Sequence, residues 1–274
     1  MLRSLHDLRK YTLSATDGNI GSVTDFYFDD ESWVVRYLVV DTDPWLMGRT
    51  VLISPISIGR PDFMERDLPV TLSKDQIRQS PDVNAHRPVS RQMESGYAGY
   101  YGYQSYWTGA GLWWGGIYPN AGYGYGGGES GWLPLEQRRQ MSSGYLRDLA
   151  DHHARDDVHL RSSNAVTGYH ILATDGELGH VDGFLIDEDT WAIRFLIVNT
   201  SNWWVGQQVL VAPEWIERIS WSDSVVTLAI SRDTVRSAPP YKAGQVIERT
   251  QEPALFAHYG RTGFWKPGES RVRA

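Results

Sequence analysis

One run of the chain carries residue types that could bind a metal. Within DHHARDDVH, His152, Asp156 and His159 follow one another at helical spacing, so a helix would place them on one face. Imidazole and carboxylate groups are zinc ligands, and such a face could support metal-dependent hydrolysis. The run occurs once, without an identifiable group to orient the ligands, and this favours a solvated polar helix. We therefore expect no metal and no cofactor, with a metal-dependent hydrolase as the alternative from another functional class.

No other pattern in the chain indicates catalysis. The sequence has no cysteine, which excludes disulfides, a cysteine nucleophile and thiolate metal ligands. It also offers no Walker-type loop, carboxylate dyad or Ser/His/Asp arrangement that can be argued. None of the eight histidines recurs in the internal repeat described next. We expect a protein without enzymatic activity.

The chain contains a second copy of its own sequence. Ser4 aligns with Ser162 and Trp107 with Trp265, without a gap between them. A repeat of this length should bury its own core, so two copies predict two domains. The predicted organisation is a first repeat over 4–107, a linker over 108–161 and a second repeat over 162–265. The linker is first rich in glycine, tyrosine and tryptophan, which disfavours regular structure, and then polar and compatible with a helix.

The elements of each copy are predicted to be short β-strands. Runs of β-branched and aromatic residues predict strands over 19–29, 33–40, 50–53 and 68–72, each with its twin in the second copy. One more strand should precede the ATDG motif. Ser73 and Ser231 are suitable N-caps for a short helix after the last strand. We expect an all-β fold of mostly antiparallel strands that closes into a small barrel, since closure removes exposed edges.

An aromatic extension follows each set of strands. Four of its residues recur between the copies: Glu94, Tyr101, Gly102 and Trp107 return as Glu252, Tyr259, Gly260 and Trp265. We expect a short helix or hook whose aromatic side chains pack onto a barrel. We expect the extensions and the linker to hold the two barrels together as an intramolecular pseudo-dimer, with each extension crossing to the other barrel.

Both copies contain a glycine motif that could be mistaken for a phosphate loop. A phosphate loop leads into a helix N-terminus, whereas a strand follows here. Asp-Gly between two strands is typical of a hairpin, because glycine tolerates a positive φ. We interpret as structural turn positions Asp17, Gly18 and Gly21, with Asp175, Gly176 and Gly179 in the second copy.

An arginine lies in the middle of a predicted strand in each copy. Alternation places Arg36 on the face shared with apolar neighbours, so it should be at least partly buried and should need a partner. The nearest candidates kept by both copies are Asp29 for Arg36 and Asp187 for Arg194. A structural ion pair is favoured over an anion-binding arginine, because buried charges are usually paired.

Tryptophans lie in the loop that precedes the third predicted strand. Trp45 occupies this loop in the first copy, and Trp203 and Trp204 occupy it in the second. Loop tryptophans can anchor a partner, since tryptophan is enriched at interface hot spots. They can equally cover the end of a barrel. Both interpretations stay open, and these three residues are the first candidates for partner contact.

The order of these elements resembles the PRC-barrel family. The resemblance rests on DGxxG, FxxD, WxxRxLVVDT, WxxGxxVLISP and the SKDQIR helix, over roughly residues 5–80 and 163–238. The family includes the cytoplasmic domain of the photosynthetic reaction centre H subunit, the C-terminal domain of a ribosome maturation factor and many bacterial proteins. It implies two small antiparallel PRC-type β-barrels in tandem, each with a short helix and an aromatic C-terminal extension. It also implies docking onto other macromolecules without a common catalytic activity.

These observations predict a non-enzymatic adaptor that binds a protein partner. A ribosome or RNA-processing accessory factor is the alternative, although the net charge of −7 argues against nucleic-acid contact. No stretch approaches the roughly 18 apolar residues of a spanning helix, so we expect no membrane span. The N-terminus has no apolar leader region, and we expect a cytoplasmic location.

Overall fold

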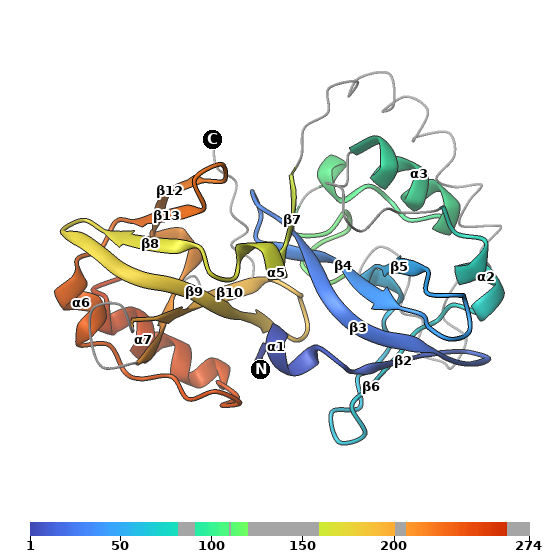
Figure 1. The fold of residues 1–274 in the computed structure, drawn as a ribbon, viewed down its shortest axis with the longest axis horizontal. Coiled ribbons are helices and arrows are strands. Elements are labelled where there is room, and N and C mark those ends of the chain that lie inside the picture. The colour runs from blue at the N-terminus through green and yellow to red at the C-terminus, as the bar shows by residue number, and fades with distance from the viewer. Residues whose placement is uncertain (82–90, 110, 120–158, 201–206, 262–274) are drawn as a thin grey trace. The chain divides into compact units, whose positions relative to one another are not determined.

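In the computed structural model the chain is mostly β and contains two mixed sheets (Figure 1). The structure describes residues 1–81, 91–109, 111–119, 159–200 and 207–261. The chain divides into two compact units. One unit holds most of the first repeat, and the other holds most of the second.

The sheet of the first repeat follows the predicted strands closely. Its strand order is β5-β4-β3-β2-β6. The strands are β2 (Thr12–Ala15), β3 (Gly18–Asp29), β4 (Val34–Asp41), β5 (Thr50–Ile53) and β6 (Asp67–Pro69). Helix α2 (Lys74–Arg78) follows, and α3 (Arg91–Tyr101) forms the core of the extension.

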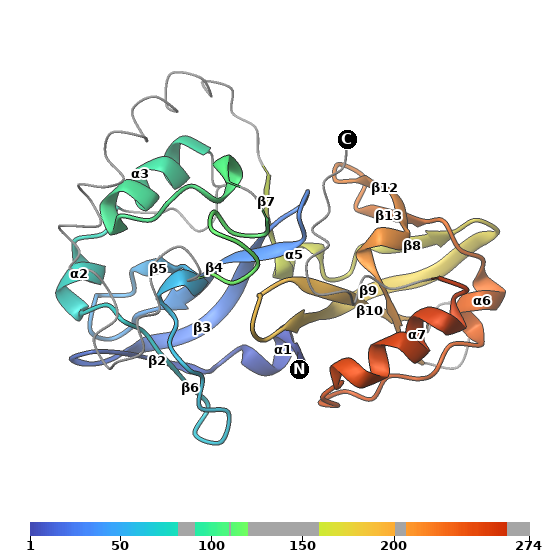
Figure 2. The same cartoon turned by 180° about the vertical axis from the view of Figure 1, so that it is seen from behind.

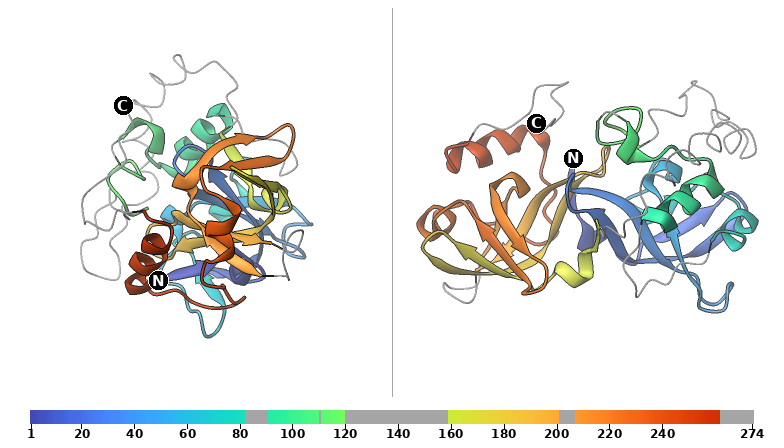
Figure 3. Two further views of the ribbon diagram at one scale, coloured as in Figure 1. Left: turned by 90° about the vertical axis from the view of Figure 1, so that its left-hand side faces the viewer. Right: turned by 90° about the horizontal axis from the view of Figure 1, so that it is seen from above.

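The sheet of the second repeat has the same order with one strand added. It runs β11-β10-β9-β8-β13-β12. The strands are β8 (His170–Ala173), β9 (Gly176–Asp187), β10 (Ile193–Asn199), β11 (Gln208–Val211), β12 (Ile216–Ser220) and β13 (Val225–Leu228). The helices are α5 (Ser163–Val166), α6 (Arg232–Arg236) and α7 (Glu252–His258), and Figures 2 and 3 show both sheets from further directions.

Most strand pairs are antiparallel, as predicted, but each sheet also contains a parallel pair, so the sheets are mixed and not purely antiparallel. β2 pairs in parallel with β6, and β8 pairs in parallel with β13. The reason lies in the number of chain reversals. In the first repeat, β2 to β5 alternate in direction, and the 3-10 turn Pro55–Ser57 and the loop after it reverse the chain once more. The next strand therefore runs parallel to β2 when it pairs with it.

The core of each unit lies against the long central strand. Phe26 and Phe28 on β3 are fully buried, as are Phe184 and Leu185 on β9. Complete burial of such a side chain contributes roughly 1.5–3 kcal/mol, so these positions supply much of the driving force for folding. The predicted apolar runs thus form the core of each sheet.

The aromatic extensions pack onto their own repeats. The Tyr97 hydroxyl on α3 donates to the Leu52 carbonyl on β5. The Tyr259 hydroxyl, at the end of α7, donates to the Leu210 carbonyl on β11 at 2.9 Å. The expectation that each extension crosses to the other barrel is therefore wrong. Each tyrosine is long enough to reach a strand carbonyl of its own copy.

What crosses between the repeats is the short strand that leads into each. β1 (Leu2–Ser4) pairs antiparallel with β9 of the second repeat, and β7 (Leu160–Ser162) pairs with β3 of the first. Both strands read Leu-Arg-Ser. Accordingly, Met1–Leu8 belong to the compact unit of the second repeat, and the chain up to Arg161 belongs to that of the first.

Equivalent ion pairs hold the two exchanged strands. Arg3 Nε donates to Glu188 Oε1 at 2.7 Å, and Arg161 Nε donates to Asp30 Oδ2 at 2.6 Å. All four side chains are at most one quarter exposed. Burial raises the pKa of Asp30, and the hydrogen bond and charge of Arg161 oppose this shift. The two repeats therefore exchange the strands that lead into them reciprocally.

The ATDG motifs form turns, each of which also caps a helix. Asp17 Oδ1 accepts the Lys74 amide at the start of α2 at 2.8 Å, and Asp175 Oδ1 accepts the Arg232 amide of α6 at 2.8 Å. The serine caps are also present, with Ser73 accepting from Gln76 N. Gly18 and Gly176 have positive φ angles of 128° and 137°, in agreement with the predicted turn.

Among the described glycines, Gly21 and Gly179 should tolerate a side chain least. A Cβ at Gly21 would lie 1.9 Å from the Asp41 carbonyl oxygen, and one at Gly179 would lie 2.0 Å from that of Asn199. Both residues also have positive φ. Either change to alanine should lower the free energy of unfolding by at least about 3 kcal/mol, as measured by urea denaturation.

Gly48→Ala is the matched control. Gly48 also has a positive φ, of 72°, but no atom lies within 4 Å of its added Cβ. Its substitution should cost only about 1–2 kcal/mol, the strain of φ alone. Equal losses for Gly21→Ala and Gly48→Ala would show that the close carbonyl approach is unimportant.

Candidate functional site

A buried arginine lies beneath the aromatic extension of the first repeat. Arg36 on β4 is 3% exposed, as its place on the apolar face predicts. Its Nη1 donates to the Leu112 carbonyl at 2.5 Å, and its Nη2 donates to Ser32 Oγ at 2.9 Å. One guanidinium thus ties the strand to the segment that follows the extension.

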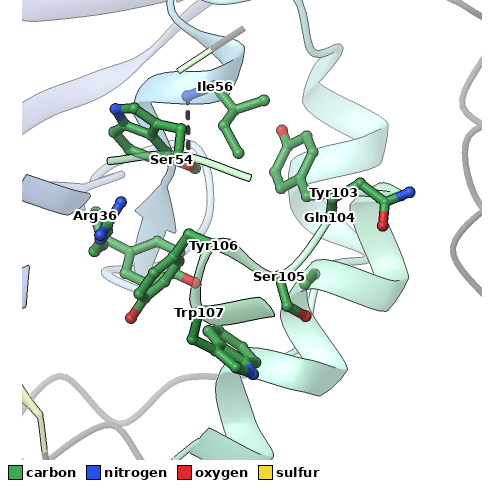
Figure 4. A pocket seen from close by; sticks show the side chains of 11 residues that line it. Arg36, Ser54, Ile56, Tyr103, Gln104, Ser105, Tyr106 and Trp107 are labelled. Atoms are coloured by element: carbon green, nitrogen blue, oxygen red, sulfur yellow. Dashed lines mark hydrogen bonds between the residues drawn. The ribbon is translucent and has the colours of Figure 1, made fainter. Parts of the chain in front are cut away.

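Aromatic rings cover this guanidinium. Its Cζ lies 3.7 Å from the ring centroid of Tyr106 and 4.7 Å from that of Trp113. Figure 4 shows Arg36 beside Tyr106 at the edge of a pocket that Ser54, Tyr103 and other residues line. Burial lowers the pKa of Arg36, while the neighbouring tyrosines and carboxylates oppose this shift. Cation–π contact stabilises a buried cation where a carboxylate is not in hydrogen-bond contact.

Asp29 is not the hydrogen-bond partner that the sequence predicts for Arg36. Its Oδ1 accepts the backbone amides of Glu31 at 3.1 Å and Ser32 at 2.8 Å, which stabilises the turn between β3 and β4. Its charge acts on Arg36 through space. A short aspartate beside a turn meets the turn amides first, because they are its nearest donors.

The second repeat supplies a carboxylate partner that the sequence analysis missed. Arg194 Nη2 donates to Glu252 Oε2 at 3.3 Å, and Glu252, the first residue of α7, is 1% exposed. The predicted partner, Asp187, pairs with Arg249 at 2.6 Å instead. A signal was present, since both copies keep the glutamate of the extension as well as the arginine of the strand.

The first repeat uses the same glutamate in a different way. Glu94 is 1% exposed, and its Oε1 accepts the Tyr106 hydroxyl at 2.7 Å. Tyr106 therefore contacts both the buried acid, through its hydroxyl, and Arg36, through its ring. Both copies keep an arginine on the strand and a buried glutamate on the extension and connect them differently; Arg36 is buried, whereas the Arg194 side chain is 19% exposed.

A short turn of the predicted linker presents apolar side chains to solvent. Trp113 is 2% exposed, whereas the exposed fractions are 38% for Trp114, 43% for Ile117 and 44% for Tyr118. Trp113 and Gly116 exchange two backbone hydrogen bonds, of 2.8 and 2.9 Å. This part of the linker is thus a defined turn without a helix or strand, and residues 120–158 of the predicted linker lie outside the described residues. We call Gly111–Tyr118 the aromatic turn.

Glycines allow the aromatic turn to be this compact. A Cβ at Gly109 would lie 2.3 Å from the Trp114 carbonyl oxygen, and one at Gly111 would lie 2.7 Å from that of Gly116. The glycine content that indicates an irregular linker therefore also permits a tight backbone crossing. Arg36, through the Leu112 carbonyl, fixes the turn to the core.

The contacts of Trp45 fit a cover over the sheet more closely than an open anchor. Its indole N–H donates to the Ile20 carbonyl at 2.6 Å, and the ring lies 5.4 Å from Lys74 Nζ and 5.6 Å from Arg78 Cζ. The side chain is half-buried. Trp203 and Trp204 lie outside the described residues.

The predicted zinc face cannot be placed in full. His152 and Asp156 lie outside the described residues, and His159 Nδ1 lies 3.7 Å from Asp30 Oδ1 and 3.5 Å from Glu31 Oε1. Within the described ranges there is no group of three His, Asp or Glu side chains suited to hold a metal ion. No helix of this part of the chain is both long and apolar enough to cross a membrane.

Comparison with known protein families and with curated proteins gives no match for this chain.

Arg36→Lys should destabilise the first repeat although it keeps the charge. A lysine cannot serve the Leu112 carbonyl and Ser32 Oγ in one plane while stacking on Tyr106. We expect the free energy of unfolding, measured in urea, to fall by about 1–3 kcal/mol. Arg194→Lys is the matched control and should cost less, because the contact of Arg194 with its carboxylate is long, at 3.3 Å. Equal losses would contradict the role of the forked guanidinium.

The stability of the Glu252→Gln variant relative to the wild type should increase as the pH rises. Burial raises the pKa of Glu252, and the charge of Arg194 only partly offsets this. The folded state then holds the proton to a higher pH than the unfolded chain, so its contribution to stability is lost as the pH rises through the folded value. Glutamine mimics the protonated acid but does not titrate, so the variant keeps this contribution to stability at higher pH. Urea unfolding at about pH 4 and 7 measures the difference.

Glu217→Gln on β12 is the control for the substitution itself, since Glu217 is exposed. The two proteins are compared by their free energies of unfolding. If the difference between them does not change with pH, or changes in favour of the wild type as the pH rises, the cost of ionising a buried Glu252 is contradicted.

Proposed function

We propose that this chain is a non-enzymatic binding protein of two PRC-barrel modules that docks onto a protein partner. The observation that carries the proposal is the aromatic turn, in which a buried tryptophan and a buried arginine hold exposed Trp114, Ile117 and Tyr118. Tryptophan and tyrosine are enriched among the residues that dominate binding energies. A turn fixed in advance loses little further freedom on binding.

The place of the aromatic turn in the sequence supports the same proposal. The two repeats share turn glycines, strand aliphatics and buried charges, which build a scaffold. The aromatic turn follows Trp107, where the similarity between the copies ends. A surface present once in a duplicated chain is suited to one specific partner. The net charge of −7 favours a protein over a nucleic acid as that partner.

The shared strand order supports the assignment to PRC-type barrels. The order β5-β4-β3-β2-β6 in one sheet corresponds to β11-β10-β9-β8-β13 in the other. We propose that each sheet is the wall of a small barrel, with the long, bulged β3 or β9 as the strand that bends around it. In this proposal the barrels serve as rigid supports for their loops and extensions.

Replacement of Trp114, Ile117 and Tyr118 by serine should weaken partner binding while the fold persists. The partner is first isolated with the wild-type chain from its native source and then titrated by calorimetry. We expect the triple variant to bind at least about ten-fold more weakly, since anchors of this kind commonly each contribute over 1 kcal/mol. The variant should still unfold cooperatively in urea with only a modest loss of stability, because none of the three side chains belongs to the buried core.

Met64→Ser is the control, since Met64 is 92% exposed in a different loop of the same repeat. Equal affinity of wild type and triple variant would place the interface elsewhere. Salt-dependent RNA binding would support the accessory-factor alternative. Stoichiometric zinc in the purified protein, lost on substitution of His152 and His159, would support the hydrolase alternative.

A further inference from the structure

Each of the two exchanged strands, β1 and β7, could pair with the edge of either β9 or β3. β1 and β7 have the same sequence, Leu-Arg-Ser. Their leucines are 0% and 4% exposed, and their arginines form the equivalent pairs with Glu188 and Asp30 described above. Each edge therefore offers an apolar position and a carboxylate at matching places.

The backbone pairing repeats in the same way at both edges. The Glu188 amide donates to the Met1 carbonyl at 3.1 Å, and the Asp30 amide donates to the His159 carbonyl at 2.9 Å. Met1 and His159 each stand directly before the Leu-Arg-Ser strand. Side chains and main chain thus specify the same donor sequence and the same register at the two edges.

We propose that this strand exchange also takes place between two copies of the chain, so that β1 of one copy pairs with β9 of the other. β1 is already separate from the sheet of its own repeat, since Met1–Leu8 lie in the compact unit of the second repeat. β1 is held by β9, by Glu188 and by Ile247, and these contacts would be the same with a donor strand from a second copy. Exchange of an identical element is a low-cost route to a dimer.

Concentration decides between the closed and the exchanged forms. A donor in the same chain acts at an effective concentration on the order of millimolar, so the closed monomer dominates in dilute solution. Opposite charges placed on separate chains should reverse this preference. In Arg3→Glu, the introduced carboxylate would face Glu188 within the chain. In Glu188→Arg, the introduced guanidinium would face Arg3.

A mixture of these two variants provides the test. Each intramolecular pair is then repulsive, whereas both intermolecular pairs between the two variants are attractive. We expect native mass spectrometry of the equimolar mixture, warmed to the onset of unfolding and cooled, to show a heterodimer at least about ten-fold more abundant than either homodimer, which corresponds to roughly 1.4 kcal/mol. Monomers without heterodimer would overturn the proposal.

The double variant Arg3→Glu/Glu188→Arg is the matched control. It restores opposite charges within one chain and should stay as monomeric as the wild type. Should a single variant fail to fold alone, circular dichroism provides the readout. Recovery of the β signal on mixing supports the exchange, and an unfolded mixture beside a folded double variant overturns it. Arg161→Glu and Asp30→Arg repeat the test at the β7 edge.

Discussion

The need to pair the backbone along one long strand shapes each sheet. β3 and β9 are twelve residues long, whereas β2 and β8 beside them are four residues long. The remaining edge of each long strand would expose unpaired amides and carbonyls, which are costly when buried and invite aggregation when exposed. The Leu-Arg-Ser strand covers this edge, and it comes from the other repeat. Most other strands follow from local hairpins.

A second constraint is the cation beneath the extension of each sheet, which is buried at Arg36 and mostly buried at Arg194. Arg36 and Arg194 occupy equivalent places, and each meets the extension that closes over it. In the second repeat the partner is the carboxylate of Glu252, whose own burial opposes ionisation. In the first, Tyr106 lies against the guanidinium and binds Glu94 through its hydroxyl. Because aromatic rings and not a carboxylate cover Arg36, its guanidinium can donate to the Leu112 carbonyl. This hydrogen bond anchors the aromatic turn.

The strands, turns and helix caps could be predicted because their signals are local. The ATDG turns and the Ser73 cap each depend on residues within a few positions or on a repeated spacing. The parallel pairing of β6 with β2 depends on counting chain reversals, and the loop before β6 hides one of them. A three-residue strand carries too little periodicity to predict its partner, so the exchange of β1 and β7 could not be foreseen.

The partner of the arginine and the aromatic turn were missed for different reasons. Arg194 and Glu252 are both identical in the two repeats, but Asp187 was predicted as the partner because it is nearer to Arg194 along the chain. For the aromatic turn, the density of glycine indicated irregular structure. The structure shows that Gly109 and Gly111 serve close packing, which a single sequence cannot distinguish from flexibility.

The reciprocal strand exchange also dictates an order of events during synthesis. The contact between Arg3 and Glu188 spans 185 positions, and that between Arg161 and Asp30 spans 131. The first sheet cannot be completed until the ribosome has released residue 161, well after its own last strand has emerged. The N-terminal strand waits longer still, until β9 has been made. Contacts so distant in sequence slow folding, and the nascent chain carries an unpaired Leu-Arg-Ser segment throughout this interval.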